Sequence, residues 1–418
     1  MHDFIFKNNE LMCEGVKVSA IAKSVGTPFY LYSYNTIADH FTKIQKAFAP
    51  LSATICYAMK ANGNLAIIKS LVDLGAGIDI VSSGELKKAL LVKADPKKIV
   101  FASVGKTDEE ITFAIKAGIL FFNVESEPEL ARINMVAKKM NKKTQVALRI
   151  NPDVPAPTHE YITTGSLKKK FGIDLRTTRA ILMNRQKYPM IAINGIHIHI
   201  GSQITSGVPF VNAIKIVVKF INELKDEGVN IEYLDIGGGL GIIYKDEKPQ
   251  SAADYAAKVV PMLLKTGLKI IMEPGRFIVG NAGIFVTKVL YVKDNGVKRF
   301  VIVDGGMNDL IRPMLYNAYH EIVPVKDVGA TKIKVDVVGP ICESGDFFAH
   351  DRPLPKVNSN DLLAVMSAGA YGYVMSSNYN VRGRVPEVMV KGNKFAITKA
   401  RENFRDLIKG ETIPGFIK

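Results

Sequence analysis

The chain has 418 residues, of which 47% are hydrophobic and 23% are charged. This composition excludes a disordered or collagen-like chain, and the length suits two or three domains or one large barrel with an appended domain. Lys and Arg outnumber Asp and Glu by 55 to 40, a net charge of +15, so a polyanionic partner has to be considered.

The start of the chain and its cysteines indicate the cellular compartment. Residues 1–15 mix charged and apolar side chains and lack the apolar centre of a signal peptide. No apolar run approaches the roughly 18 residues of a membrane-spanning helix. Three cysteines, Cys13, Cys56 and Cys342, form an odd set that does not indicate a disulfide framework. We therefore expect a cytoplasmic protein with no membrane association.

From about residue 33, short β-branched runs alternate with segments that have the period of amphipathic helices. The first helix is expected over residues 33–48. The eight strand-like runs that follow are residues 54–59, 77–82, 98–103, 120–125, 145–151, 195–200, 233–237 and 270–273. The helical segments between them include residues 65–74, 85–92, 109–117, 129–140, 210–227 and 254–265.

Eight alternating units are typical of a (β/α)₈ barrel, whereas an open doubly wound sheet usually stops at five to seven strands. The runs are almost continuously apolar, as parallel strands covered by helices should be. After Arg276 the pattern changes to strand-like runs at residues 278–292, 300–304, 332–338, 362–366, 387–390 and 394–398. We expect an α/β fold in which residues 33–276 form the barrel, and residues 1–32 join 277–418 in a mostly β domain.

A barrel of this kind carries its reactive groups at the carboxyl ends of its strands. Polar or glycine residues lie at or just after those ends. They are Lys60, Asp79, Ser82, Ser103, Glu125, Arg149, His199, Ser202, Gly237, Gly238, Gly239, Glu273 and Arg276. We expect these residues to converge on one mouth of the barrel.

Lys60 ends an apolar strand, where burial lowers a lysine's pKa and suits it to form an imine with a carbonyl group. The alternative is a lysine that leaves the barrel for solvent. Gly237, Gly238 and Gly239 follow another strand, at a place where such barrels commonly bind phosphate, although a tight turn explains a glycine run equally well. Ser202 adds a hydroxyl donor there.

Glu273 and Arg276 follow the eighth strand, so the carboxylate is placed to hold a pyridine nitrogen protonated and the guanidinium to supply positive charge. A structural Glu–Arg pair is the alternative. His199 shares a strand face with His197 and is able to stack on a flat ring, although a lone histidine is more often structural. No cluster has zinc-site spacing, and no Walker loop or G-x-S-x-G motif is present.

Two features of the β domain also suggest chemistry. Cys342 and Glu343 place a thiol beside a carboxylate among turn residues, and an exposed thiol can act as an acid. Arg312 and Tyr316 are four residues apart, on one face if helical, as a clamp for a carboxylate requires. Ordinary packing is the alternative for both pairs.

Six ordered segments of the chain resemble the pyridoxal-phosphate decarboxylases of the alanine racemase-like fold, also called fold type III. They are residues 57–62, 197–203, 235–241, 273–276, 339–346 and 369–373. The resemblance spans nearly the whole chain and is greatest to the family members that decarboxylate meso-2,6-diaminopimelate to L-lysine and CO₂, the final step of lysine biosynthesis. The chain differs from the family's usual pattern in having Gly383 where Pro is common, and residues 158–172 resemble the family's substrate lid.

The resemblance implies roles for individual residues. Lys60 would bind pyridoxal 5′-phosphate as a Schiff base, His199 would stack on its ring, and Glu273 would contact its pyridine nitrogen. The residues expected to complete the cofactor site are Asp79, Ser202, Gly237, Gly238, Gly239, Pro274, Gly275, Arg276 and Tyr371. The residues expected to bind substrate are Arg276, Arg312, Tyr316, Glu343 and Tyr371. Cys342 would donate a proton, from the partner subunit of a homodimer with shared sites.

The expected substrate follows from the same residues. A glutamate beside the pyridine nitrogen favours the protonated ring, the stronger electron sink, and so decarboxylation over racemisation. Two arginines with one glutamate suit a second amino-acid head group, whereas ornithine or arginine would need acids for a lone cationic tail.

Three alternatives stay open. They are a related decarboxylase of ornithine, arginine or a carboxylated polyamine precursor, a non-catalytic carrier of pyridoxal phosphate, and a nucleic-acid binder. The last is disfavoured because the dense basic clusters are short, as at Lys168, Lys169 and Lys170. Most of the net charge is then a solvated lysine-rich surface. Lys60, Arg149, Arg276 and Arg312 are expected to face two small anions instead.

Overall fold

The computed structural model describes residues 2–154, 170–327 and 329–417. The chain forms two compact units, one of Ile37–Val279 and the other of Met1–Thr36 with Gly280–Lys418. The division expected from the sequence, 33–276 against 1–32 with 277–418, stays a prediction. Most of the expected lid, residues 158–169, lies outside the described residues.

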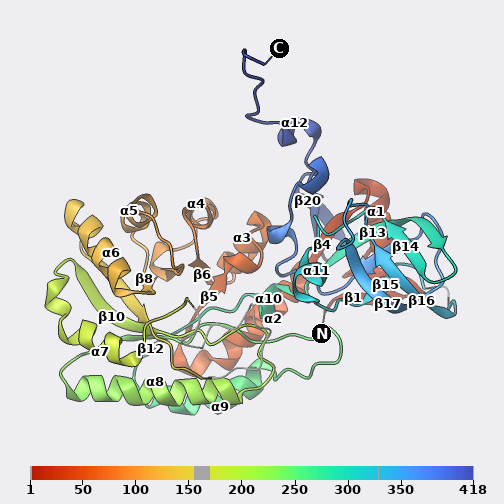
Figure 1. Ribbon diagram of the computed structural model, residues 1–418. Helices are drawn as coiled ribbons and strands as arrows, with labels where there is room; N and C mark the ends of the chain where they lie inside the picture. The colour runs from red at the N-terminus through yellow and green to blue at the C-terminus, as the bar shows by residue number, and fades with distance from the viewer. Residues whose placement is uncertain (1, 155–169, 328, 418) are drawn as a thin grey trace. The chain divides into compact units, whose positions relative to one another are not determined.

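The first unit is built on a closed barrel of eight parallel strands (Figure 1). The strands are β5 (Thr54–Ala58), β6 (Gly77–Ile80), β7 (Ile99–Phe101), β8 (Phe121–Val124), β9 (Thr144–Arg149), β10 (Ile191–His197), β11 (Tyr233–Asp235) and β12 (Lys269–Met272). They follow one another around the barrel in chain order, and β12 pairs with β5 to close it. The predicted (β/α)₈ barrel is confirmed.

Helices precede, connect and follow the strands of the barrel. They are α2 (Tyr34–Ala47), α3 (Leu65–Asp73), α4 (Ser83–Leu91), α5 (Asp108–Ala117), α6 (Glu127–Lys139), α7 (Leu175–Met183), α8 (Val208–Asp226), α9 (Ala252–Leu264) and α10 (Arg276–Val279), with short 3₁₀ turns at Ala49–Leu51, Met59–Ala61, Pro96–Lys98 and Arg185–Lys187. Several begin at a side-chain cap, and Thr107 and Ser251 form full capping boxes with Glu110 and Asp254. Such caps satisfy backbone N–H groups that a helix leaves unpaired.

The second unit is mostly β. Its strands are β1 (Phe4–Lys7), β2 (Glu10–Cys13), β3 (Val16–Lys17), β4 (Phe29–Ser33), β13 (Gly283–Asp294), β14 (Arg299–Val303), β15 (Ile322–Pro324), β16 (Lys332–Val338), β17 (Phe347–Pro355), β18 (Leu362–Val365), β19 (Glu387–Lys391) and β20 (Lys394–Lys399). The helical segments are α1 (Val18–Val25), α11 (Arg312–Tyr316), α12 (Phe404–Leu407) and 3₁₀ turns at Tyr373–Met375 and Tyr379–Val381.

Both ends of the chain contribute to the main sheet of this unit. Strand β4 lies between β13, with which it pairs antiparallel, and β19, with which it pairs parallel. The sheet order is β17-β16-β14-β13-β4-β19-β20, and β18 pairs with both β13 and β15. The expected joining of an N-terminal strand to the C-terminal β domain is thus confirmed.

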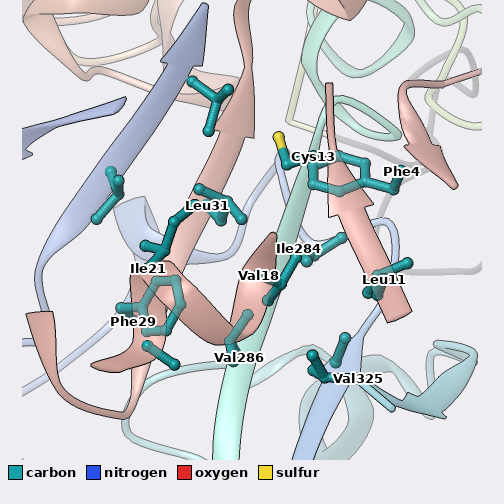
Figure 2. Close-up of a cluster of buried hydrophobic side chains, with 14 of the residues drawn as sticks. Phe4, Leu11, Cys13, Val18, Ile21, Phe29, Leu31, Ile284, Val286 and Val325 are labelled. Carbon is teal, nitrogen blue, oxygen red and sulfur yellow. The ribbon is translucent and has the colours of Figure 1, made fainter. Parts of the chain in front are cut away.

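A hydrophobic cluster fixes α1 against this sheet (Figure 2). Val18 and Ile21 of α1 pack in one cluster with Phe29 of β4 and with Ile284 and Val286 of β13, and all five are fully buried. Burying one such side chain contributes about 1.5–3 kcal/mol.

Several elements differ from the sequence-based expectation, among them strands β15 and β17, which were not expected. Helix α1 lies within a segment expected to be strand-like, because its apolar residues at positions 18, 21 and 22 all face the core. The strand expected from residue 278 begins at Gly283, because Ile278 and Val279 donate backbone hydrogen bonds to Gly275 and close a helical turn. Helix α7 was not among the expected helices.

Candidate active site

The barrel interior changes from apolar to polar along its strands. Cys56, Phe121, Ala147 and Ile271 come from four different strands and lie together in one buried cluster. Side chains two positions apart on a strand point to the same face. Asn123, Arg149 and Glu273 therefore follow Phe121, Ala147 and Ile271 on the inward face, one step nearer the carboxyl ends. This end of the barrel is where such folds carry their active sites.

Lys60 lies in the 3₁₀ turn Met59–Ala61, directly after β5, and forms an ion pair with Asp79 of β6. Lys60 Nζ is 2.6 Å from Asp79 Oδ2, the Lys60 side chain is 33% exposed, and the Asp79 side chain is fully buried. Burial raises the pKa of Asp79 to about 7, with the charge of Glu273 adding to the rise and the Lys60 ammonium opposing it. The lysine thus has both a counterion and access to solvent.

Glu273 is buried just after β12 and is surrounded by polar groups of other strands. The Asn123 amide donates to Glu273 Oε1 at 2.9 Å, and His197 Nε2 lies 3.3 Å from Glu273 Oε2. Burial by itself would raise the pKa of Glu273, but the neighbouring His197 and Lys60 outweigh it and hold this pKa well below its usual value. The carboxyl group is therefore ionised although it is buried.

His199 follows β10 and is half-buried. Burial lowers the pKa of His199 well below its usual value, and the positive charges of Arg149 and Lys60 lower it further. The imidazole is therefore neutral near pH 7. Its Nδ1 accepts a hydrogen bond from the Gly238 backbone N–H at 3.3 Å, which fixes the ring beside the glycine run.

Gly237, Gly238 and Gly239 leave no room for side chains. A Cβ on Gly238 would lie 2.2 Å from the Glu273 carbonyl oxygen, and one on Gly239 would lie 2.3 Å from that of Gly201. Gly237 and Gly239 also have positive φ values of +67° and +105°, which residues with side chains rarely adopt. The run therefore forms a close-packed backbone surface of the kind that binds phosphate.

Arg276 donates hydrogen bonds to two hydroxyl groups at the barrel mouth, those of Ser202 and Tyr244. It is buried, and its Nη2 donates to Ser202 Oγ at 3.1 Å while its Nη1 donates to Tyr244 Oη at 2.6 Å. The preceding residues Pro274 and Gly275 are buried as well, and the Pro274 carbonyl accepts from the Ala58 N–H at 3.1 Å. A guanidinium held between two hydroxyl groups suits an oxyanion.

A second buried ion pair lies at the same end of the barrel. Arg149 Nη1 is 2.5 Å from Glu125 Oε1, and both side chains are less than a tenth exposed. Glu125 also accepts from the Gly172 N–H at 2.9 Å, and the Arg149 guanidinium lies over the Phe171 ring. These contacts fix the chain where it returns to the barrel.

Of the substrate residues expected from the sequence, Arg276 lies in the barrel unit and Arg312, Tyr316, Glu343 and Tyr371 lie in the β unit. Arg312 is buried in α11, its Nε donates to His320 Nε2 at 3.3 Å, and its guanidinium centre is 5.9 Å from the Tyr316 ring centroid. The expected helical pairing of Arg312 with Tyr316 is present. Tyr371 is half-buried and has a φ of +56°.

Cys342 and Glu343 lie on an exposed turn of the β unit. The Cys342 N–H donates to Asn380 Oδ1 at 3.0 Å, and Cys342 is a free, exposed cysteine, unlike the buried Cys13 and Cys56. A hydrogen bond with Glu343 raises the pKa of Tyr379. The turn is thus tied to the loop around residue 380.

The structure brings one further set of residues to the site. Asn123 and Asp235 are fully buried beside Glu273, and Tyr244 is bound to Arg276. The alternation of β8 places Asn123 on the same face as Phe121, and that is the signal by which the sequence could have revealed it. A ring nitrogen of His197 and a carboxyl oxygen each of Asp235 and Glu273 lie within 4.8 Å of one another.

The described part of the chain contains no helix that is both long and apolar enough to cross a membrane.

Comparisons with known proteins identify relatives of this chain. Residues 34–280 match the family model for the pyridoxal-binding domain of pyridoxal-dependent decarboxylases. The diaminopimelate decarboxylase of Aquifex aeolicus (strain VF5) is 48% identical over 405 residues, which are 97% of this chain and 96% of that protein.

Two solved structures are also similar. The crystal structure of diaminopimelate decarboxylase from Helicobacter pylori complexed with L-lysine is 40% identical, has a TM-score of 0.90, and matches 94% of this chain and 98% of that one. The enzyme from M. jannaschii in co-complex with L-lysine is 38% identical, has a TM-score of 0.95, and matches 100% of both chains.

Proposed function

This chain belongs to the pyridoxal-dependent decarboxylases, and within them to the diaminopimelate decarboxylases, and we propose that it converts meso-2,6-diaminopimelate to L-lysine and CO₂ as the final step of lysine biosynthesis. The observation that supports this most directly is the pairing of Lys60 with buried Asp79 at the same barrel mouth as ionised Glu273 and the glycine run. The near full-length identity to proteins of that name supports the substrate.

The residues of the barrel mouth fit pyridoxal 5′-phosphate. The glycine run packs closely against the backbone of Ile198, Gly201 and Glu273, and Asp79 Oδ1 is buried and accepts no hydrogen bond from the described residues. When bound, this cofactor supplies an electron sink for the carbanion that remains after CO₂ leaves. Lys60 would bind its aldehyde carbon, and Glu273 would accept a hydrogen bond from its ring nitrogen.

Other residues would hold the cofactor in place. His199 would stack on the cofactor ring. Because its imidazole is neutral, it would not attract the phosphate away from the phosphate-binding residues. The phosphate would be bound at the run Gly237, Gly238 and Gly239, by the backbone of Gly275, by Ser202 and by Arg276, with Pro274 supporting that turn and Tyr371 closing the site. The N–H groups of Gly237 and Gly238 donate to Asp235 and His199 and so hold the run in position. The close-packed glycines support this assignment.

The substrate would be recognised by its two charged ends. Arg276, Arg312 and Tyr316 would bind the distal carboxylate, and Glu343 the distal ammonium group. The buried Arg312 guanidinium beside the Tyr316 ring supports the first assignment, because an arginine fork matches carboxylate geometry. The exposed position of Glu343 leaves its carboxylate accessible.

Cys342 would donate the proton that replaces CO₂, from the partner subunit of a homodimer with shared sites. Its exposed thiol supports this role, because a proton donor must reach the substrate. Three free cysteines fit a reducing compartment such as the cytoplasm.

The cofactor assignment is tested by absorbance spectroscopy of the purified protein supplied with pyridoxal phosphate. We expect a visible band that borohydride abolishes, and a reduced adduct that peptide mapping places on Lys60. Lys60→Ala should remove both, whereas Lys88→Ala, which changes a lysine of α4, should keep them. An adduct on another lysine would contradict the proposal.

The substrate is tested by measuring CO₂ and amino-acid products from meso-diaminopimelate, ornithine and arginine. We expect L-lysine from the first and no turnover of the others. Release of CO₂ from ornithine alone would establish the related decarboxylase instead.

The acid role of Cys342 is tested by Cys342→Ala. We expect the adduct on Lys60 to form normally while kcat falls by about 10²–10⁴-fold, the usual contribution of a general acid. Cys13→Ala, at a buried cysteine, is the control for loss of a thiol. Unchanged turnover of Cys342→Ala would remove the acid role.

The shared site is tested by mixing the two inactive variants, Lys60→Ala and Cys342→Ala. If each site takes Lys60 from one subunit and Cys342 from the other, mixed dimers contain one intact site and regain activity. Sedimentation should show that the mixed variants form dimers. If these dimers regain no activity after subunit exchange, the sites are not shared.

A further inference from the structure

We propose that Asn123 is a positioning residue for Glu273, and that its side-chain amide, together with His197 and Asp235, holds the Glu273 carboxylate in place to keep the cofactor ring nitrogen protonated. This inference rests on the proposed function and deepens it. It assigns a role to a strand residue that touches neither the phosphate region nor Lys60 in the described contacts.

The first argument is geometric. Asn123 lies on β8 and Glu273 directly after β12, and neither strand neighbours the other in the barrel. The Asn123 amide nitrogen nevertheless reaches Glu273 Oε1 at 2.9 Å, and it lies 3.4 Å from Asp235 Oδ2. Asn123 thus crosses the barrel interior and binds both carboxyl groups.

The second argument is the orientation of the amide. Asn123 Oδ1 is buried and has no hydrogen-bond partner among the described residues. Reversing the amide would turn this oxygen towards Glu273, which is ionised and has no proton to donate. An unsatisfied buried polar atom costs about 1–3 kcal/mol. The hydrogen bonds from the amide nitrogen to the carboxyl groups therefore favour the observed orientation, although it leaves Oδ1 unsatisfied.

The third argument is the distribution of charge. Asp235 and Glu273 are both buried, and two adjacent carboxyl groups there do not both ionise. Burial raises the pKa of Asp235 well above its usual value, and the charge of Glu273 raises it further. Asp235 therefore keeps its proton while Glu273 carries the charge. Asp235 is itself fixed, because its Oδ1 accepts from the Gly237 N–H at 2.9 Å.

His197 completes the set from the opposite side. It is fully buried on β10, and its Nε2 lies 3.3 Å from Glu273 Oε2, so each oxygen of Glu273 has its own neighbour. The Asn123 hydrogen bond to Oε1 restrains the carboxylate and, together with the nearby His197 ring, lowers its proton affinity. Without the Asn123 donor, Glu273 would bind a proton more readily and take it from the ring nitrogen.

The test uses protein loaded with pyridoxal phosphate that carries ¹⁵N in its ring. Wild type should give the ¹⁵N chemical shift of a protonated ring nitrogen. Asn123→Leu removes the donor at similar size and should move the shift towards the unprotonated value, with kcat about tenfold or more lower and KM little changed. Asn123→Val, a smaller side chain suited to a strand, should behave alike.

The matched control is Asn194→Leu. Asn194 is on β10 of the same barrel and donates to Gln145 rather than to Glu273, so its loss should leave the ¹⁵N shift at the wild-type value. A wild-type shift in both Asn123 variants, or an altered shift in Asn194→Leu, would overturn the inference. If wild type itself forms no adduct on Lys60, the proposed function fails instead.

Neutron diffraction of the loaded wild type provides a second test that needs no variant. We expect an Asn123 amide deuteron directed at Glu273 Oε1, a deuteron on Asp235 and none on Glu273. A deuteron on Glu273, or an amide oxygen facing it, would overturn the inference even if both Asn123 variants failed to fold.

Discussion

Lys60 Nζ lies 2.6 Å from Asp79 Oδ2, so a lysine whose side chain is one-third exposed is paired with a carboxyl group that is fully buried. The two residues come from neighbouring strands, β5 and β6, which pair in parallel. This pairing holds the lysine at the mouth, and it ties the charge of Asp79 to the state of Lys60.

We expect the Lys60–Asp79 pair to make stability depend on pH. The pKa of Asp79 is raised from 3.8 to about 7, so the folded state binds this proton more tightly than the unfolded state. The resulting stabilisation is complete below pH 3.8 and is lost as the pH rises through about 7. In the cofactor-free protein, wild type should therefore lose stability relative to Asp79→Asn between pH 5 and pH 8.

The measurement is chemical denaturation of both proteins at the two pH values. Asp39→Asn removes an exposed carboxylate from the same unit and is the control. An equal difference between wild type and Asp79→Asn at both pH values would contradict the raised pKa.

The buried Arg149–Glu125 pair should stabilise the fold far more than an exposed pair does. Arg149→Met leaves Glu125 buried without its partner and should lower the free energy of unfolding by about 3–5 kcal/mol. Adding Glu125→Gln should recover part of this loss. Arg132→Met, which breaks an exposed pair with Asp108, should cost about 1 kcal/mol or less in the same urea denaturation. Similar losses in both pairs would show that burial does not matter here.

Gly383, which stands where the family commonly has Pro, is required by its neighbours in this chain. A Cβ there would lie 2.6 Å from the Glu402 carbonyl oxygen, and Arg384 and Glu402 hold the two segments together by backbone hydrogen bonds and an ion pair. Gly383→Ala should therefore lower the free energy of unfolding by about 1–3 kcal/mol. Gly415→Ala, where no atom lies within 4 Å of the added Cβ, should change it little. Equal effects would show that the loop adjusts freely.

The sequence predicted the barrel because parallel strands covered by helices are continuously apolar and recur at regular intervals. It also indicated the mouth, because a strand's carboxyl end is recognisable from the residue that interrupts its apolar run, as at Lys60 and Glu273. The roles of these residues came from the family resemblance, since position alone favoured a Lys60 that leaves the barrel for solvent.

Other parts of the site were not predictable in this way. Strand alternation indicates that Asn123 faces inward, but its hydrogen bonds to Asp235 and Glu273 join different strands, and no local pattern reveals them. Tyr244 and Arg276 are 32 positions apart and meet only in the folded barrel. Helix α1 was misjudged because eight residues with several β-branched side chains resemble a strand until their burial at positions 18, 21 and 22 is seen.

The glycine run offers the sharpest test of the proposed phosphate site. Gly238 has no positive φ, so Gly238→Ala introduces only the clash with the Glu273 carbonyl oxygen, 2.2 Å from the new Cβ. We expect the free energy of unfolding to fall by about 1–3 kcal/mol and pyridoxal phosphate to bind more weakly, because the backbone must move away from Glu273. Gly105→Ala, in the same unit with no atom within 4 Å, should change neither. Urea denaturation and cofactor titration measure the two effects separately. If Gly238→Ala lost stability but bound the cofactor as wild type does, the run would be a packing feature of the barrel and the phosphate would have to bind elsewhere.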